Sequence, residues 1–255
     1  MSDNPTSTDR VRSMLVIAAT FGTIVFNILS ATGRINGITP EVISDKYVTS
    51  VTPAAFAFTI WTLIYAGLIA FSIYQFLPAN LVKYRSIRTF YILSCALNCG
   101  WIYFWHGDQI AVCLVLIILL AVSLFYINLN LKETETLAEF WLAKAPFGIY
   151  FGWVSAAALV NFAILLVSMG VQMTETAWTT ISVALILFAA ALGILMRVRL
   201  TNYLYPLAIA WALTAIAVKQ SGQTAVVVAC AIGVVISLIA TLSFVVNLPS
   251  STTAK

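Results

Sequence analysis

The sequence predicts an all-α integral membrane protein with about eight transmembrane helices. Of its 255 residues, 62% are hydrophobic and only 9% are charged, and the mean hydropathy is +1.00. This balance is typical of a chain whose surface faces lipid. Apolar stretches of about 20 residues, long enough to cross a bilayer, recur along the whole chain. Barrel strands would show alternating segments of about ten residues instead, and the sequence lacks that pattern.

Eight ranges account for the apolar stretches. The first follows Arg10 and Arg12, and its length and the lack of an Ala-x-Ala cleavage pattern before Gly33 favour an uncleaved helix over a signal peptide. The seventh is short and ends at Lys219, so its limits are the hardest to fix. In order, the predicted spans are 14–32, 55–77, 88–105, 110–129, 140–168, 177–196, 203–218 and 223–246.

Composition divides the chain into four parts. Polar tails are predicted at residues 1–10 and 248–255. A Trp- and Asn-rich part, residues 11–169, holds the first five spans. The remaining three spans, within residues 170–247, are dominated by Ala, Val, Ile and Leu.

The basic residues predict the orientation, because Lys and Arg accumulate on the cytoplasmic side. An inside N-terminus places ten of the thirteen basic residues inside and leaves Arg34, Lys46 and Lys219 outside. We therefore expect both termini in the cytoplasm. A bacterial cytoplasmic membrane is the expected location, since no transit peptide is evident. The net charge of +4 needs no nucleic acid to explain it, because anionic lipid headgroups account for basic loops.

The sequence predicts neither a catalytic nor a metal site. It contains no Gly-x-Ser-x-Gly or His-Glu-x-x-His motif, and all nine acidic residues lie in tails, loops or span ends. The cysteines at 95, 99, 113 and 230 fall within spans, where thiols are usually inert. His106 beside Asp108 is interpreted as an interfacial polar pair. We expect no required cofactor and no enzyme, although photo-oxidative porphyrin breakdown stays open as a third reading.

Three helices carry aromatic and amide side chains at helical spacing, so each presents one polar-aromatic face. Trp and Tyr populate interfacial belts and Asn can join helices, and these roles are the plain alternative to a pocket. Trp105, Trp141 and Trp178 lie at span ends and are assigned to belts. The residues further inside the spans suit a planar amphipathic ligand as well as they suit packing. They are Trp61 and Tyr65, then Asn98 and Trp101, then Tyr150, Trp153 and Asn161.

At these positions the chain resembles the TspO/MBR family, the tryptophan-rich sensory or translocator proteins. The stretch from Thr52 to Tyr65, TPAAFAFTIWTLIY, is similar to that family's Pro-Pro-x-Trp-x-Phe-x-x-x-Trp-Thr-x-x-Tyr. Asn98-Cys-Gly-Trp101 with Gly107 resembles its Asn-x-x-Trp-x-x-x-Phe-Phe-Gly. Tyr150-Phe-Gly-Trp153 with Asn161 resembles its Pro-Tyr-x-x-Trp and later Leu-Asn. The three segments follow in the family's order and spacing across about residues 12–168.

The resemblance implies a five-helix bundle with a ligand cavity, capped by the loop that joins the first two spans. Members bind porphyrins, sterols or synthetic aromatic compounds and are described as regulatory or sensory. The three additional spans would mark an extended eight-helix branch. Carried over position by position, the cavity residues would be Trp61, Tyr65, Asn98, Trp101, Tyr150, Trp153, Ala156 and Asn161.

Four positions depart from the family pattern. The family's first Pro aligns with Thr52, its next Trp with Ala55, its Phe with Ala57, and the Pro before the later Tyr with Ile149. Fewer aromatic groups on the lid side predict a roomier or different pocket.

The sequence leaves two main hypotheses. The first is a receptor or sensor for a hydrophobic planar ligand, such as a porphyrin, a haem-type tetrapyrrole or a sterol-like molecule. The alternative is a transporter of a small solute or lipophile, against which stands the lack of a midplane charge or an inverted repeat. Besides the bilayer and the ligand, a homodimer is left open as a partner.

Overall fold

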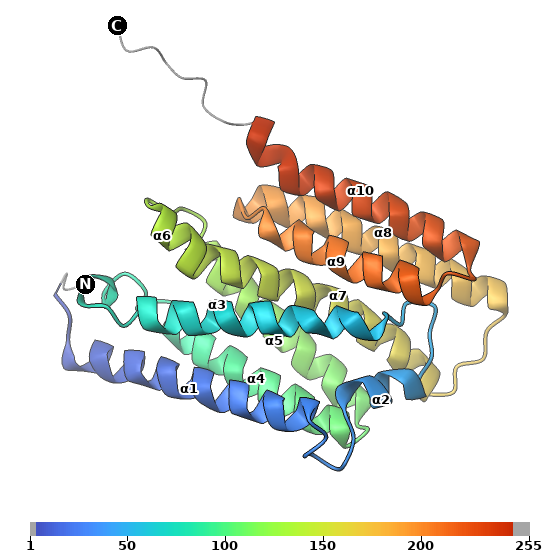
Figure 1. The fold of residues 1–255 in the computed structure, drawn as a ribbon, viewed down its shortest axis with the longest axis horizontal. Coiled ribbons are helices and arrows are strands. Elements are labelled where there is room, and N and C mark those ends of the chain that lie inside the picture. Colours follow the sequence, from blue (N-terminus) through green and yellow to red (C-terminus); the bar gives the residue numbers. More distant parts are fainter. Residues whose placement is uncertain (1–3, 247–255) are drawn as a thin grey trace, which may run out of the picture.

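The computed structural model describes residues 4–246, with side chains up to residue 243, as a bundle of long helices that run side by side (Figure 1). The described residues contain helices and loops but no strand, which confirms the all-α prediction. The long helices of the structure correspond to the eight predicted spans. They are α1 (Ser7–Ala31), α3 (Ile60–Tyr74), α4 (Arg88–His106), α5 (Ile110–Asn130), α7 (Ala145–Ser168), α8 (Glu175–Leu200), α9 (Leu204–Lys219) and α10 (Thr224–Val246).

Six stretches are long and apolar enough to cross a membrane, which makes the chain an integral, multi-pass membrane protein. Two of the eight helices fall outside that group. α9 is apolar but shorter, and α4 carries Arg88, Asn98 and His106 among its apolar residues. The count of eight crossings therefore stays a prediction. The stretches are Ser7–Ala31, Ala55–Tyr74, Ile110–Asn130, Leu137–Ser168, Glu175–Leu200 and Thr224–Ser243.

The first helix begins seven residues before its predicted start, inside the segment expected to be a tail. Thr6 and Asp9 form a capping box, in which the Thr6 hydroxyl accepts from the Asp9 backbone N–H and the Asp9 carboxylate accepts from that of Thr6. Arg85 then donates two hydrogen bonds to Asp9, at 2.6 and 2.5 Å. Polar residues thus extend α1 and fix it to the loop before α4. The other predicted tail, 248–255, lies outside the described residues.

A continuous helical stretch leads into α7 through α6 (Leu137–Glu139) and a π-helical turn, η3 (Phe140–Lys144). Pro146 cannot donate a backbone N–H, and the wider turn just before it keeps the chain helical. A Cβ at Gly67 would lie 2.7 Å from the Pro146 Cβ. Glycine at this position is therefore what allows α3 and α7 to approach.

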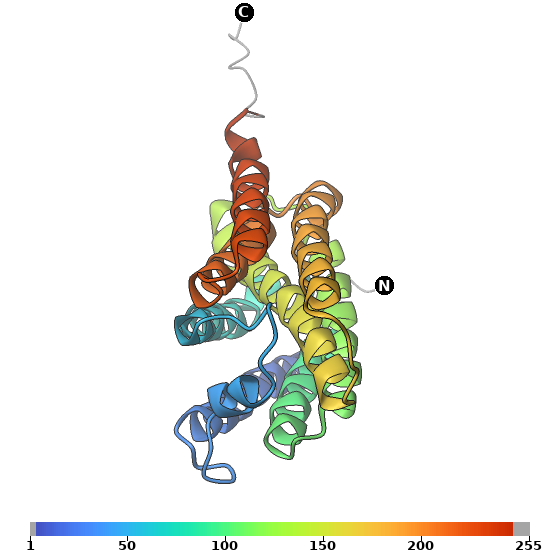
Figure 2. The ribbon, with the colours of Figure 1, turned by 90° about the vertical axis from the view of Figure 1, so that its right-hand side faces the viewer.

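Two groups of helices meet at α7 (Figure 2). One contains α1, α3, α4, α5 and α7, and the other contains α8, α9 and α10. The joint between α7 and α9 is very close. A Cβ at Gly148 would lie 2.3 Å from the Asn202 side chain, and one at Gly152 would lie 2.4 Å from the Tyr205 carbonyl oxygen. Gly152 thus lets the α7 backbone approach that of α9, and Gly148, one turn earlier, makes room for the Asn202 side chain just before α9.

The segment between α1 and α3, residues 33–59, forms what we call the lid. It contains α2 (Pro40–Lys46), which lies outside the predicted spans, and η1 (Ala55–Thr59). The first five residues of the predicted span 55–77 thus form a 3-10 turn instead of an α-helix. Another short turn, η2 (Pro78–Asn80), follows α3 at the opposite end of the bundle. The indole N–H of Trp105 donates to the Pro40 carbonyl at 3.0 Å, so α4 holds one end of the lid.

The expected pairing of His106 with Asp108 is not formed. The His106 ring bonds to the Ile102 carbonyl and the Ser30 hydroxyl, at 2.8 and 3.2 Å. Asp108 instead pairs with Lys46 and accepts from the Tyr47 hydroxyl at 2.9 Å. Asp108 adopts a positive φ of 58° in the turn after α4, and its carboxylate serves the lid while the imidazole stays inside the bundle.

Candidate functional site

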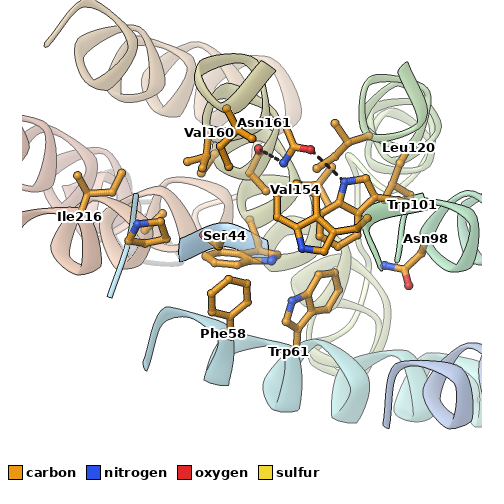
Figure 3. A pocket seen from close by; sticks show the side chains of 18 residues that line it. Ser44, Phe58, Trp61, Asn98, Trp101, Leu120, Val154, Val160, Asn161 and Ile216 are labelled. Atoms are coloured by element: carbon orange, nitrogen blue, oxygen red, sulfur yellow. Dashed lines mark hydrogen bonds between the residues drawn. The ribbon is translucent and has the colours of Figure 1, made fainter. Parts of the chain in front are cut away.

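A closed cavity of about 50 Å³ lies between α3, α4, α5, α7 and α9, under the lid. Figure 3 shows flat aromatic rings on several of its sides. Two amide side chains and Ser44 of the lid are the other polar residues that line it, and aliphatic residues and Pro53 complete the lining. The aromatic groups are Phe58, Trp61, Trp101, Trp105 and Trp153, and the amides are Asn98 and Asn161.

The structure brings six of the eight predicted site residues to this cavity: Trp61, Asn98, Trp101, Trp153, Ala156 and Asn161. Tyr65 lies on a separate cleft outside it. Tyr150 is buried behind Trp61, with the two ring centroids 5.8 Å apart. That any of the eight contacts a ligand stays a prediction.

Trp61 and Trp153 form two walls at nearly a right angle. Their ring centroids are 6.3 Å apart with an interplanar angle of 84°. Phe58 meets Trp153 edge to face at 6.1 Å, and Tyr65 stacks on the outer side of Trp61 at 5.5 Å. Such edge-to-face and stacked contacts hold the rings in fixed orientations.

The third indole wall is fixed by an amide. Asn161 accepts a hydrogen bond from the Trp101 indole N–H at 3.2 Å and donates its own amide to the Ala157 carbonyl at 2.9 Å (Figure 3). Trp105 stacks on Trp101 with centroids 5.3 Å apart. The role of Asn161 is therefore to orient Trp101, since both ends of its amide are occupied.

Asn98 differs from Asn161 because half of its amide is unused. Its oxygen accepts from the Asn27 side chain at 2.8 Å, while its nitrogen makes no hydrogen bond of normal geometry although the residue is fully buried. The Tyr150 hydroxyl lies close enough to interact with this amide but does not complete a normal hydrogen bond to it. In Figure 3 this nitrogen faces the aromatic rings. A buried donor without a partner costs about 1–3 kcal/mol. The cavity thus presents one unused hydrogen-bond donor to whatever occupies it.

A larger cleft of about 350 Å³ lies on the other side of the aromatic wall, between α1, α3, α4 and the lid. It shares Phe58, Trp61 and Trp101 with the closed cavity. Polar groups from Asn27, Glu41, Thr59, Thr62 and Tyr65 line it together with apolar ones. These three aromatic side chains therefore border both spaces.

A family model described as TSPO-like protein matches residues 13–244. The chain belongs to the TSPO-like family. The match runs through α8, α9 and α10, beyond residue 168 where the motif resemblance ends, so the three last helices are part of what the family model describes. A comparison with curated proteins and another with solved structures found no match.

Several residues of this TSPO-like cavity were missed or misassigned from the sequence. Trp105 is only 3% exposed and lines the cavity, so its assignment to an interfacial belt is wrong. Its i, i+4 spacing from Trp101 could have shown this. Ala212 and Ile216 of α9 also line the cavity, and they carry no signal because they look like ordinary apolar residues of a span.

That fewer lid aromatics give a roomier or different pocket than in the family stays a prediction. The cavity measures about 50 Å³, and Ala212 and Ile216 of α9 contribute to its lining. Four free cysteines occur in the described residues, and nowhere in that part of the chain do three His, Cys, Asp or Glu side chains gather as a metal site would require.

Proposed function

We propose that this TSPO-like protein is a membrane receptor or sensor that binds a hydrophobic planar ligand between Trp61 and Trp153. The observation that carries the proposal is the unpartnered Asn98 amide, which faces an aromatic cavity from a fully buried position. A porphyrin or sterol-like ligand with an acceptor atom would pair with this donor while its flat face stacks on indole rings.

Size sets a condition on binding. An engineered cavity of about 150 Å³ is known to hold benzene, so the closed cavity of about 50 Å³ is too small for even one aromatic ring. The neighbouring cleft adds about 350 Å³, and ligand pockets usually measure about 300–1,000 Å³. A planar ligand would therefore bind with Trp61 or Phe58 turned aside, so that it occupies the two spaces together.

The side chains that line the cavity support ligand binding without a chemical reaction. Indole, phenyl, amide, aliphatic and hydroxyl groups, the last from Ser44, bind and orient, but none of them is a general acid or base with an ordinary pKa near neutral pH. The proposal is therefore a binding protein whose occupied and empty states differ at the Trp61 wall. A regulatory role would follow if that difference reaches a partner protein.

The test is a titration of purified protein in lipid nanodiscs with protoporphyrin IX, followed through the porphyrin absorbance so that the signal does not depend on tryptophan. Saturable binding is expected, and Trp153→Ala should weaken it about tenfold through loss of stacking and buried area. Trp141→Ala is the matched control, because Trp141 is 59% exposed and does not line the cavity. Equal affinity of all three proteins would refute the site, and no binding to the wild type would refute the porphyrin.

A second titration with a fluorescent sterol distinguishes the ligand class. The same loss in Trp153→Ala, seen with the sterol and not with the porphyrin, would retain the site and change its ligand. Asn98→Ala should weaken only ligands that present an acceptor atom, since it removes the unpaired donor.

A further inference from the structure

The lid is attached to α9 by hydrogen bonds at several points along its second half. The backbone N–H of Ala54 donates to the Ala215 carbonyl at 3.0 Å. The indole N–H of Trp211 donates to the Ala57 carbonyl, also at 3.0 Å. Figure 1 shows the chain after α2 rising to the end of α9. These two hydrogen bonds therefore join about one turn of α9 to the last part of the lid.

Gln220, just after α9, is the strongest of these attachments. Its side-chain amide donates to two lid carbonyls, those of Thr49 and Thr52, at 3.1 and 3.0 Å. Gln223 donates to the Gln220 amide oxygen at 3.0 Å and so fixes its orientation. Both Gln220 and Thr52 are buried, where a hydrogen bond is harder to replace by water. An exposed ion pair between Lys219 and Asp45, at 3.1 Å, adds a weaker link.

The attachment occurs where the lid departs from the family pattern. Thr52 stands in place of a proline, and its carbonyl accepts from Gln220. Ala57 stands in place of a phenylalanine and is fully buried, with its carbonyl bonded to Trp211. Trp211 also meets Phe56 edge to face at 5.5 Å. An indole from α9 thus packs on the lid beside the positions where the lid has lost its own aromatic groups.

The same helix completes the cavity. Ala212 and Ile216 line it about two turns and one turn, respectively, before the end of α9, on the helix that holds the lid. A shift of α9 would therefore change the volume of the cavity and the position of its lid together.

We propose that α9 controls access to the ligand cavity, with Gln220 and Trp211 as positioning residues that keep the lid closed and Ala212 and Ile216 as the wall that limits ligand size. This inference rests on the proposed function for what enters the cavity, but the lid attachment itself can be measured without any ligand. Release of the lid from α9 opens the cavity at its lid end, while the α7–α9 joint stays in place.

The experiment is hydrogen–deuterium exchange of ligand-free protein in nanodiscs, resolved to peptides covering residues 45–60. Gln220→Met keeps the side-chain length and removes both donors. The Ala54 amide and its neighbours should exchange about tenfold faster in this variant, since two buried hydrogen bonds are lost and the lid opens locally. Peptides from α4 and α7 should exchange as in the wild type.

Gln172→Ala serves as the control, because Gln172 is an exposed loop glutamine whose side chain donates only to the nearby Gly170 carbonyl. Unchanged exchange at residues 45–60 in Gln220→Met would overturn the inference. So would a uniform increase over the whole chain, which would mean general destabilisation. If Gln220→Met does not fold, Trp211→Phe removes a single donor to the lid and is held to the same criterion at residues 54–59.

A ligand measurement separates this inference from the proposed function. With a porphyrin that binds the wild type, Gln220→Met should raise both the association and dissociation rates by similar factors, because a looser lid opens more often. Slower or unchanged rates would refute control of access by α9. A wild type that binds no porphyrin would refute the ligand, while the exchange result would still test the lid.

Discussion

The two halves of the molecule are held together by different means. Helices α1, α3, α4 and α7 are joined by buried polar side chains, such as Thr20 with Ser72 and Tyr91, or Trp101 with Asn161. Helices α8 and α10 instead approach α9 through small residues. A Cβ at Gly233, for example, would lie 2.6 Å from the Leu213 side chain. The hydroxyls of Thr241 and Ser243 donate to carbonyls within α10 and do not join it to another helix.

The difference shows which half carries specific chemistry. Directional hydrogen bonds fix the orientation of aromatic rings around a cavity, whereas close packing of small residues fixes only the distance between helices. The second half meets the first at the α7–α9 joint, at the lid, along α8, and at the turn before α9, where Asn202 donates to Asn128 and to the Lys144 carbonyl. The predictions below test each side of this contrast.

The largest effect is expected at the α7–α9 joint. Gly152→Leu would place side-chain atoms into the Tyr205 carbonyl and the Ala208 Cβ, which a Cβ alone would approach to 2.4 and 2.8 Å. We expect the free energy of unfolding in detergent to fall by at least about 3 kcal/mol. Gly22→Leu is the control, since nothing lies within 4 Å of a Cβ there. Equal stability of the two variants would mean that the joint is not close-packed.

A pair of serine substitutions should have opposite effects in the two halves. Ser72→Ala removes a hydroxyl 2.6 Å from that of Thr20, and we expect a loss of about 1 kcal/mol. Ser237→Ala removes a fully buried hydroxyl of α10 that has no partner, so the stability should stay equal or rise. Denaturant unfolding of both variants measures the contrast. If Ser237→Ala lowers the free energy of unfolding as much as Ser72→Ala does, the two halves do not differ in how hydrogen bonds stabilise them.

The smallest effect is expected at the exposed end of the lid. The Asp108 carboxylate, and after it the Tyr47 hydroxyl, raise the pKa of Lys46 above its ordinary 10.5 by hydrogen bonding. A raised pKa means that this contribution to stability is fully present below pH 10.5 and is lost as the pH rises through the folded-state pKa. The melting temperature of Lys46→Ala should therefore lie slightly below that of the wild type at neutral pH. The gap should close as the pH rises through the raised folded-state pKa, and it should narrow with added salt. A gap that widens on raising the pH would contradict this account.

Sequence patterns predicted most helix limits to within a few residues, because long apolar stretches end at charged or turn-forming residues. The start of α1 was missed because Thr6 and Asp9 are polar, and their capping box is visible only as a local motif. The short helix α2 was missed because its seven residues have no apolar period. The helical spacing of aromatic and amide side chains on α4 correctly predicted that Asn98 and Trp101 line the cavity.

The contribution of α9 could not be predicted in the same way. Ala212 and Ile216 are ordinary residues of an apolar helix, and their role depends on a long-range approach permitted by Gly148 and Gly152. Gln220 looked like a residue of a polar loop, although it is buried against the lid. The role of Gln220 arises from contacts with residues more than 150 positions earlier in the chain.

The most direct test of the central claim is the spectrum of the seven tryptophan indole N–H groups in selectively ¹⁵N-labelled protein, each assigned by a Trp→Phe substitution. At saturating protoporphyrin IX, the signals of Trp61, Trp101 and Trp153 should shift strongly, because their rings line the cavity. The signals of Trp141 and Trp178 should stay in place. Bound porphyrin that leaves the three cavity signals unmoved, or that shifts only Trp141 or Trp178, would contradict the account.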